Sequence, residues 1–190
     1  MKIYLMLTDT NTVLSRTIKL YTKAKYNHAS LALEPGLLKP YSFGRKHAYN
    51  PFSGGFIEED LSRHYFLRAQ CAIYSCEVSE QQYDRLVDVL SFYNQTKDLY
   101  RFNLIGLVTL ALNIDFDRSD AFFCSQFVAS VLKESDIYQF EKESYFVTPE
   151  DLSKVPLFEQ IYSGSLLDYL LTTSEEQTKT QMSYWTNEFI

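Results

Sequence analysis

A cysteine at the start of a predicted helix is the residue in this sequence best suited to nucleophilic chemistry. Cys124 lies in the apolar run Phe122–Val128, which continues as an amphipathic helical pattern to about Ser135. Unpaired N–H groups and the helix dipole favour a thiolate at such a position. A thiolate attacks carbonyl carbon atoms, so this position predicts covalent catalysis through a thioester.

A histidine far upstream can supply the base that a catalytic thiol needs. His28 comes directly before the alternating segment 29–34, so its ring shares one face of a predicted strand with Ser30 and Ala32. An imidazole can take the proton of the thiol and later deliver it to the leaving group. The sequence therefore predicts a cysteine–histidine pair formed by two distant parts of the chain.

A third group must fix the tautomer of the imidazole. Ser42 is the first candidate, because it lies on a predicted strand next to the histidine strand. Glu34, at the end of the histidine strand, and Tyr41 are the alternatives. For the oxyanion of a tetrahedral intermediate, we expect the backbone N–H groups of Cys124 and Ser125 as donors.

Cysteine and histidine can each also have a purely structural role. A cysteine in an apolar run is commonly a small core residue, and a histidine that enters a strand commonly makes a structural hydrogen bond. Cys71 and Cys76, on a predicted strand with opposite-facing side chains, and His47 and His64, in charged loop-like surroundings, receive only this interpretation. The histidines and cysteines show no metal-ligand spacing, so we expect no metal and no cofactor.

The elements that would position these residues occur in separate blocks, which is typical of an α+β domain. Ser79 and Gln82 form a capping box, which predicts a helix start. Residues 1–171 are expected to form the hydrolase domain, and the polar segment 172–190 is expected to be a tail or a surface helix. Strands are predicted at 2–8, 29–34, 41–45, 55–60 and 70–78, and helices at 11–24, from Ser79, at 103–112, at 124–135 and from Thr148.

The length and composition of the chain argue against several classes of function. The 190 residues suit one domain, and a net charge of −6 with a pI of about 5.1 argues against nucleic acid as a partner. Three scattered cysteines indicate no disulfide framework, so a reduced, cytoplasmic protein is expected. No segment is long and apolar enough to predict a membrane span or a signal peptide. The sequence predicts no oligomeric state.

The order of the parts resembles the circularly permuted papain-like hydrolases, the YiiX-like and lecithin retinol acyltransferase-like branch of the NlpC superfamily. Asn27–Ser30 on a strand precedes Phe123–Phe127 on a helix, and Thr148–Leu152 is similar to the TP-x-D-L element of that branch. The resemblance spans residues 2–151. It implies an antiparallel sheet packed against a helical block that carries the cysteine helix. Many members have a carboxylate or another polar residue on the next strand as the third group, whereas here Ser42 offers only a hydroxyl.

The resemblance implies a mechanism class and leaves the substrate open. We expect a thiol-dependent hydrolase of the amidase or peptidase type, with Cys124 as nucleophile and His28 as base and then acid. The substrate would be a small peptide-like or lipid-linked amide or ester. Two alternatives stay open at this point. One is an acyltransferase or lipid-acting esterase with the same pair, and the other is a binding module that keeps the fold without catalysis.

Overall fold

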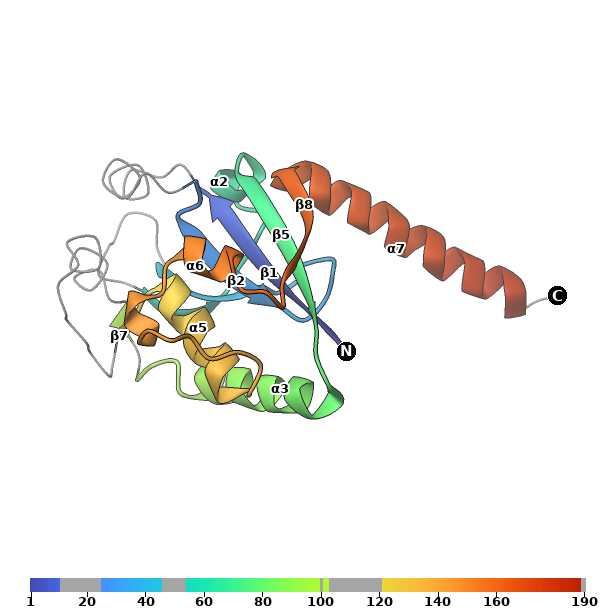
Figure 1. Cartoon of the computed structure of the whole chain (residues 1–190). Coiled ribbons are helices and arrows are strands. Elements are labelled where there is room, and N and C mark those ends of the chain that lie inside the picture. The colour runs from blue at the N-terminus through green and yellow to red at the C-terminus, as the bar shows by residue number, and fades with distance from the viewer. Residues whose placement is uncertain (11–24, 46–53, 100, 103–120, 189–190) are drawn as a thin grey trace.

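The chain folds as an α+β structure built on one six-stranded sheet. The computed structural model describes residues 1–10, 25–45, 54–99, 101–102 and 121–188 (Figure 1). Its strands are β1 (Lys2–Asp9), β2 (His28–Ala32), β3 (Tyr41–Arg45), β4 (Gly54–Glu58), β5 (Gln70–Glu77), β6 (Arg101–Phe102), β7 (Ala121–Phe122) and β8 (Glu159–Ser165). Its helices are α2 (His64–Leu67), α3 (Glu80–Gln95), α5 (Cys124–Glu134), α6 (Pro149–Ser153) and α7 (Leu166–Glu188), with a 3-10 turn at Ser144–Phe146.

The main sheet is antiparallel and has the order β4-β3-β2-β1-β5-β8. β1 runs through its middle, because it pairs with β2 on one side and with β5 on the other. All six interior residues of β1, from Ile3 to Thr8, are buried, which explains its nearly continuous apolar sequence. β6 and β7 form a separate, short parallel pair.

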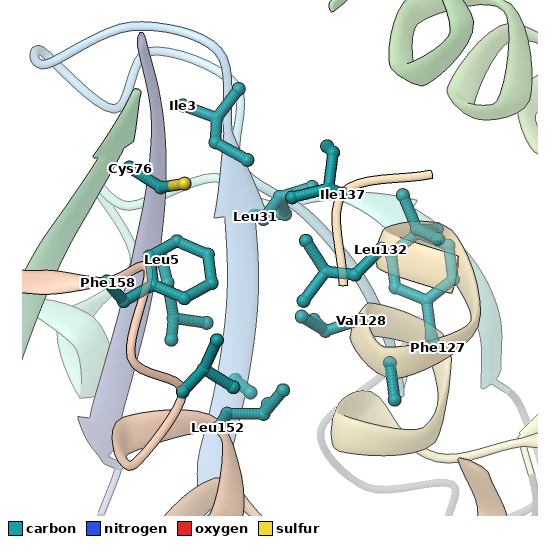
Figure 2. Close-up of a cluster of buried hydrophobic side chains, with 14 of the residues drawn as sticks. Ile3, Leu5, Leu31, Cys76, Phe127, Val128, Leu132, Ile137, Leu152 and Phe158 are labelled. Atoms are coloured by element: carbon teal, nitrogen blue, oxygen red, sulfur yellow. The ribbon is translucent and has the colours of Figure 1, made fainter. Parts of the chain in front are cut away.

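The helices α3, α5 and α6 gather beside the sheet, whereas α7 runs away from it (Figure 1). Between the sheet and α5 lies the main core, in which Leu5 and Leu31 from β1 and β2 face Val128 and Leu132 from α5 (Figure 2). A second cluster on the other face of the sheet contains Met6, Ile73 and Phe66 together with Tyr169 of α7. Both faces of the sheet are therefore covered.

Phe127 fixes α5 in the main core. Its ring is fully buried and lies 5.1 Å from that of Phe43, 5.6 Å from that of Phe56 and 5.3 Å from that of Tyr93, between ring centroids. Aromatic pairs at these separations contribute beyond the area that they bury. Because these partners come from β3, β4 and α3, the cluster holds the start of α5 against the sheet.

Most predicted elements within the described residues are confirmed. The strand at 41–45 has the predicted bounds, and α5 ends one residue before the predicted end. Ser79 and Gln82 form both hydrogen bonds of the predicted capping box. Thr148 and Asp151 form a second capping box at the start of α6. The predicted helices at 11–24 and 103–112 lie outside the described residues.

Five of the described elements were not predicted: α2, β6, β7, β8 and the 3-10 turn. The short α2 begins at His64, which is exposed, and β8 forms an edge of the sheet beside β5. The helix α7 spans the position between residues 171 and 172 at which the sequence analysis placed a boundary, because the chain stays helical to Glu188. Among the described residues, no helix has the length and apolarity needed to cross a membrane.

Candidate functional site

Cys124 is the first residue of α5. Phe123 before it has extended backbone angles (φ −115°, ψ 168°), and the first backbone hydrogen bond of the helix runs from the N–H of Phe127 to the carbonyl of Phe123, at 3.0 Å. The N–H groups of Cys124, Ser125 and Gln126 therefore lie at the N-terminus of the helix, before the first N–H group that takes part in its backbone hydrogen bonds. Such N–H groups and the helix dipole favour negative charge.

Ser125 anchors this helix start to the chain beyond the 3-10 turn. Its buried hydroxyl donates a hydrogen bond of 2.6 Å to the carbonyl of Val147. With its side chain held in this way, the backbone N–H of Ser125 has a fixed position beside Cys124. The predicted oxyanion donors thus lie together on a rigid helix start.

His28 is the first residue of β2 and lies opposite Thr8 of β1. The residue before it, Asn27, donates its backbone N–H to the carbonyl of Thr8 at 3.1 Å and its side-chain amide to Asp9 at 2.7 Å. These contacts fix the start of the strand. The backbone that carries the imidazole is therefore held on both sides of the Asn27–His28 peptide bond.

Glu59 is the partner of the imidazole. Nε2 of His28 lies 2.5 Å from Oε1 of Glu59, and the other carboxylate oxygen accepts a 2.5 Å hydrogen bond from the hydroxyl of Ser30. The side chains of His28 and Glu59 are only 16% and 2% exposed. A charged pair that is so well shielded from water interacts strongly, and each carboxylate oxygen has a donor.

Burial and two neighbouring side chains shift the pKa of His28 in opposite directions. Burial lowers it, but the charge of Glu59 and the side chain of Cys124 together raise it well above 6.5. Cys124 acts both through charge and through a side-chain hydrogen bond to His28. The structure therefore brings together the two residues that the sequence analysis paired, and their interaction favours the charged form of the imidazole.

The two side chains meet at the end of the sheet. Opposite pairs on neighbouring strands point to one face, so His28, Thr8, Ser30 and Met6 share the face of the second cluster. The helix that carries Cys124 packs on the other face. Because His28 is the first residue of its strand, its ring lies at the end of the sheet, where it interacts with both Glu59 and Cys124.

Ser42, predicted as the orienting group, has a different partner. Its buried hydroxyl donates a 2.8 Å hydrogen bond to the carbonyl of Ala29. The reason is the strand register: Leu31 lies opposite Tyr41, so the antiparallel ladder places Ser30 opposite Ser42 and His28 opposite Gly44. Glu59 takes the place at Nε2 that the sequence analysis gave to Ser42.

Gly44 lies beside the imidazole. A Cβ atom at this position would lie in ordinary van der Waals contact with Cε1 of His28, at 3.9 Å, and close to Cδ1 of Ile57, at 3.0 Å. A side chain here would therefore press first on Ile57. The glycine in the predicted strand thus marks the place where the histidine ring lies across β3.

The two alternative orienting residues lie elsewhere. Tyr41 is opposite Leu31, and its ring stacks on Phe56 at 6.0 Å between centroids. Burial raises the pKa of its phenol, with the carboxylates of Glu58 and Glu34 acting in the same direction. Glu34 follows β2, and its carbonyl accepts the backbone N–H of Leu37 at 3.2 Å. The hydrogen bond at Nε2 of His28 belongs to Glu59.

Glu59 is the functional residue that the sequence analysis missed. It stands in the acidic run Glu58–Asp60, which the sequence analysis placed at the end of the predicted strand 55–60 without giving it a role, and β4 ends one residue before it. Strand alternation holds the only sequence signal: Gly55, Ile57 and Glu59 share one face, and β4 pairs with β3 so that Ile57 lies opposite Ser42. The carboxylate therefore continues the face on which His28 lies.

The other two cysteines lack these surroundings. Burial raises the pKa of the Cys71 thiol to about 12, and burial with the nearby Glu77 raises that of Cys76. They point to opposite faces of β5, as predicted, because Cys71 belongs to the second cluster and Cys76 to the main core. Within the described ranges, no group of three or more histidine, cysteine or acidic side chains is arranged to hold a metal ion.

No protein-family profile, no curated protein and no solved structure matches this chain. Its own residues provide a thiol at a helix start, an imidazole that interacts with the thiol and a buried carboxylate hydrogen-bonded to the imidazole.

Proposed function

We propose that this chain is a thiol hydrolase with a Cys124–His28–Glu59 triad, built as a circularly permuted papain-like fold. The observation that carries the proposal is the buried His28–Glu59 pair together with the side chain of Cys124, which interacts with the same imidazole through charge and a hydrogen bond. A carboxylate stabilises an imidazolium, which a hydroxyl does not do, so this triad is stronger than the one expected from the sequence.

The chain order supports the permuted form of the fold. The histidine strand comes before the cysteine helix, and the helix packs against an antiparallel sheet. All three cysteines are free thiols, which supports a reducing compartment and thus the cytoplasm.

In the first half of the reaction, His28 accepts the proton of Cys124 and the thiolate attacks the carbonyl carbon of the substrate. The negative charge on the carbonyl oxygen is stabilised by the N–H groups of Cys124 and Ser125 at the start of α5. Glu59 stabilises the imidazolium that has formed. When the tetrahedral intermediate collapses, the imidazolium gives its proton to the leaving nitrogen or oxygen, and a thioester with Cys124 remains.

In the second half, His28 removes a proton from water, and the resulting hydroxide attacks the thioester carbon. The C–S bond breaks, the carboxylic acid product leaves, and the proton on His28 returns to the sulfur. General acid–base steps of this kind contribute roughly 10²–10⁴-fold in rate. We propose short peptide-like amides as the first substrate class.

Active-site labelling tests the proposal. A peptidyl acyloxymethyl ketone should label Cys124 alone, and Cys124→Ala and His28→Gln should each abolish or strongly slow labelling. The matched controls are Cys71→Ala and Cys76→Ala, which remove buried thiols outside the triad. Equal labelling of Cys71 or Cys76, or a His28→Gln variant labelled as fast as the unsubstituted protein, would refute the triad. Hydrolysis of short peptide amides and fatty-acyl esters then separates the two substrate classes.

A further inference from the structure

The peptide group between Val147 and Thr148 is held at both of its ends. Its carbonyl accepts the 2.6 Å hydrogen bond from the hydroxyl of Ser125, and its N–H donates a 2.7 Å hydrogen bond to Oδ2 of Asp151. A peptide group is planar and rigid, so a contact at one end fixes the position of the other. Asp151 is therefore connected to Ser125 through a single rigid unit.

The carboxylate of Asp151 is itself held in place. The same oxygen accepts a 2.5 Å hydrogen bond from the hydroxyl of Thr148, and the ammonium group of Lys142 lies 2.6 Å from it. Burial raises the pKa of Asp151, but the hydrogen bonds from Lys142 and Thr148 and the charge of Lys142 together lower it. The carboxylate is therefore charged at neutral pH and binds the peptide N–H as an anion, which makes a stronger hydrogen bond than a neutral acceptor.

The chain on both sides of this peptide group is packed into the main core. Val147 and Leu152 are fully buried there, and the N–H of Val147 donates to the carbonyl of Ser144 at 3.1 Å. The 3-10 turn and α6 both contact α5 (Figure 1). The Val147–Thr148 peptide group is therefore a fixed connection between α6 and the start of α5.

Ser125 is the point at which this connection reaches the proposed oxyanion site. Its hydroxyl donates to the carbonyl of Val147, whereas its backbone N–H has no hydrogen-bond partner among the described residues. An N–H group stabilises an oxyanion well only when it is held in position before the charge develops. The carboxylate at the other end of the peptide group also polarises it, and a polarised carbonyl is a stronger acceptor for the Ser125 hydroxyl.

We propose that Asp151 is a positioning residue: through the Val147–Thr148 peptide group, it holds the backbone N–H of Ser125 where the oxyanion of the tetrahedral intermediate forms. Lys142 supports this role, because its ammonium group holds the carboxylate of Asp151. The inference rests on the proposed function, which gives the N–H of Ser125 its role at the oxyanion. Asp151 acts only through Ser125 and takes no part in proton transfer.

Two reagents separate oxyanion stabilisation from the reactivity of the Cys124 thiol. The aldehyde N-acetyl-L-phenylalanyl-glycinal adds reversibly: the thiolate forms an S–C bond, the electron pair of the C=O bond moves to oxygen, and this oxygen takes the proton of the imidazolium. Iodoacetamide forms an S–C bond with loss of iodide, and no oxyanion develops. The rate of alkylation of Cys124, followed by mass spectrometry, measures the second reaction. Protection of Cys124 by the aldehyde measures the first.

Asp151→Asn keeps the shape of the side chain and removes its charge. It should weaken binding of the aldehyde at least about tenfold, which is part of the roughly 10²–10³-fold that loss of a whole oxyanion donor costs. The rate of alkylation by iodoacetamide should stay the same. Lys142→Met, at a side chain that is 42% exposed and so compatible with folding, should weaken the aldehyde in the same direction. Glu150→Gln is the matched control, because this neighbouring carboxylate on α6 pairs with Lys154 instead.

A double substitution shows whether Asp151 acts through Ser125. Ser125→Ala removes the hydroxyl and keeps the N–H, so it cuts the same connection at its other end. Each single variant should weaken the aldehyde, and Ser125→Ala/Asp151→Asn should be no weaker than the worse of the two. Additive effects would mean that Asp151 does not act through Ser125, and would overturn the proposal.

The same measurements separate this inference from the proposed hydrolase. If the aldehyde binds the unsubstituted protein and Asp151→Asn equally well, or if Asp151→Asn slows alkylation as much as it weakens the aldehyde, the positioning role alone is overturned. If the unsubstituted protein does not bind the aldehyde and Cys124 is alkylated with the pH dependence of an ordinary thiol, the hydrolase fails and the role of Asp151 fails with it.

Discussion

Glu59 and His28 form a 2.5 Å hydrogen-bonded pair across 31 residues of the chain, with both side chains largely shielded from water. A buried charge that loses its partner destabilises a protein by about 3–5 kcal/mol, so a pair of this kind is conspicuous in a small protein. Here one member also adjoins the thiol of Cys124. The stability of the fold therefore depends on the protonation state of His28, the proposed base.

Replacement of Glu59 by glutamine should lower the pKa of His28. The amide oxygen can still accept the proton of Nε2, but the negative charge that opposes the effect of burial is gone. We therefore expect the pKa of His28 to fall. NMR titration of the Cε1–H signal measures this directly, because the chain has only three histidines and His28→Gln assigns the signal. Glu77→Gln, at an exposed end of β5, is the control. An unchanged titration would contradict the role of Glu59.

Removal of the thiol should also lower the pKa of His28. In Cys124→Ala, both the charge and the hydrogen bond that the sulfur supplies are lost, whereas the pair with Glu59 remains. The same NMR titration of His28 should therefore move to lower pH. Cys71→Ala, which removes a thiol from the second cluster, is the control. If both cysteine variants titrate like the unsubstituted protein, Cys124 and His28 do not interact.

The sequence predicted the parts of the site better than it predicted their contacts. Local patterns were sufficient for β3, for the helix that begins at Cys124 and for the capping box of α3, since each depends on residues a few positions apart. The partner of His28 depends instead on the register between β2 and β3 and between β3 and β4. No local pattern sets that register, and a shift of two residues separates the predicted neighbour of His28 from the observed one.

The local composition also gave no indication that Glu59 is the partner of His28. Three consecutive acidic side chains are typical of a solvated segment, and Glu58 and Asp60 are indeed far more exposed than Glu59. Only the middle residue turns inward, because it continues the face of Ile57 and its backbone N–H binds the carbonyl of Pro40 at 2.8 Å. Burial of a single carboxylate within a charged run requires a tertiary partner, which the sequence alone does not reveal.

Two buried serines on adjacent strands should differ in their effect on the site. Ser30→Ala leaves one oxygen of the Glu59 carboxylate without a donor, and Ser42→Ala leaves the carbonyl of Ala29 without one. Each should cost about 1–3 kcal/mol of unfolding free energy. Only Ser30→Ala should change the NMR titration of His28 and slow the labelling of Cys124. Equal changes in both variants would mean that Ser30 has a merely structural role.

The stability of the protein should depend on pH through the His28–Glu59 pair. The folded-state pKa of His28 is raised above 6.5, so the stabilisation is fully present below about pH 6.5 and is lost as the pH rises through the folded-state pKa. Glu59→Gln removes most of this stabilisation at all pH values. The difference in unfolding free energy between the two proteins should therefore be largest near pH 6, at about 3 kcal/mol, and should shrink toward alkaline pH. Urea unfolding across this range measures it, with Glu77→Gln expected to stay close to the unsubstituted protein throughout. A difference that grows with pH would show that His28 is neutral in the folded protein, because a charged imidazole is what the carboxylate stabilises.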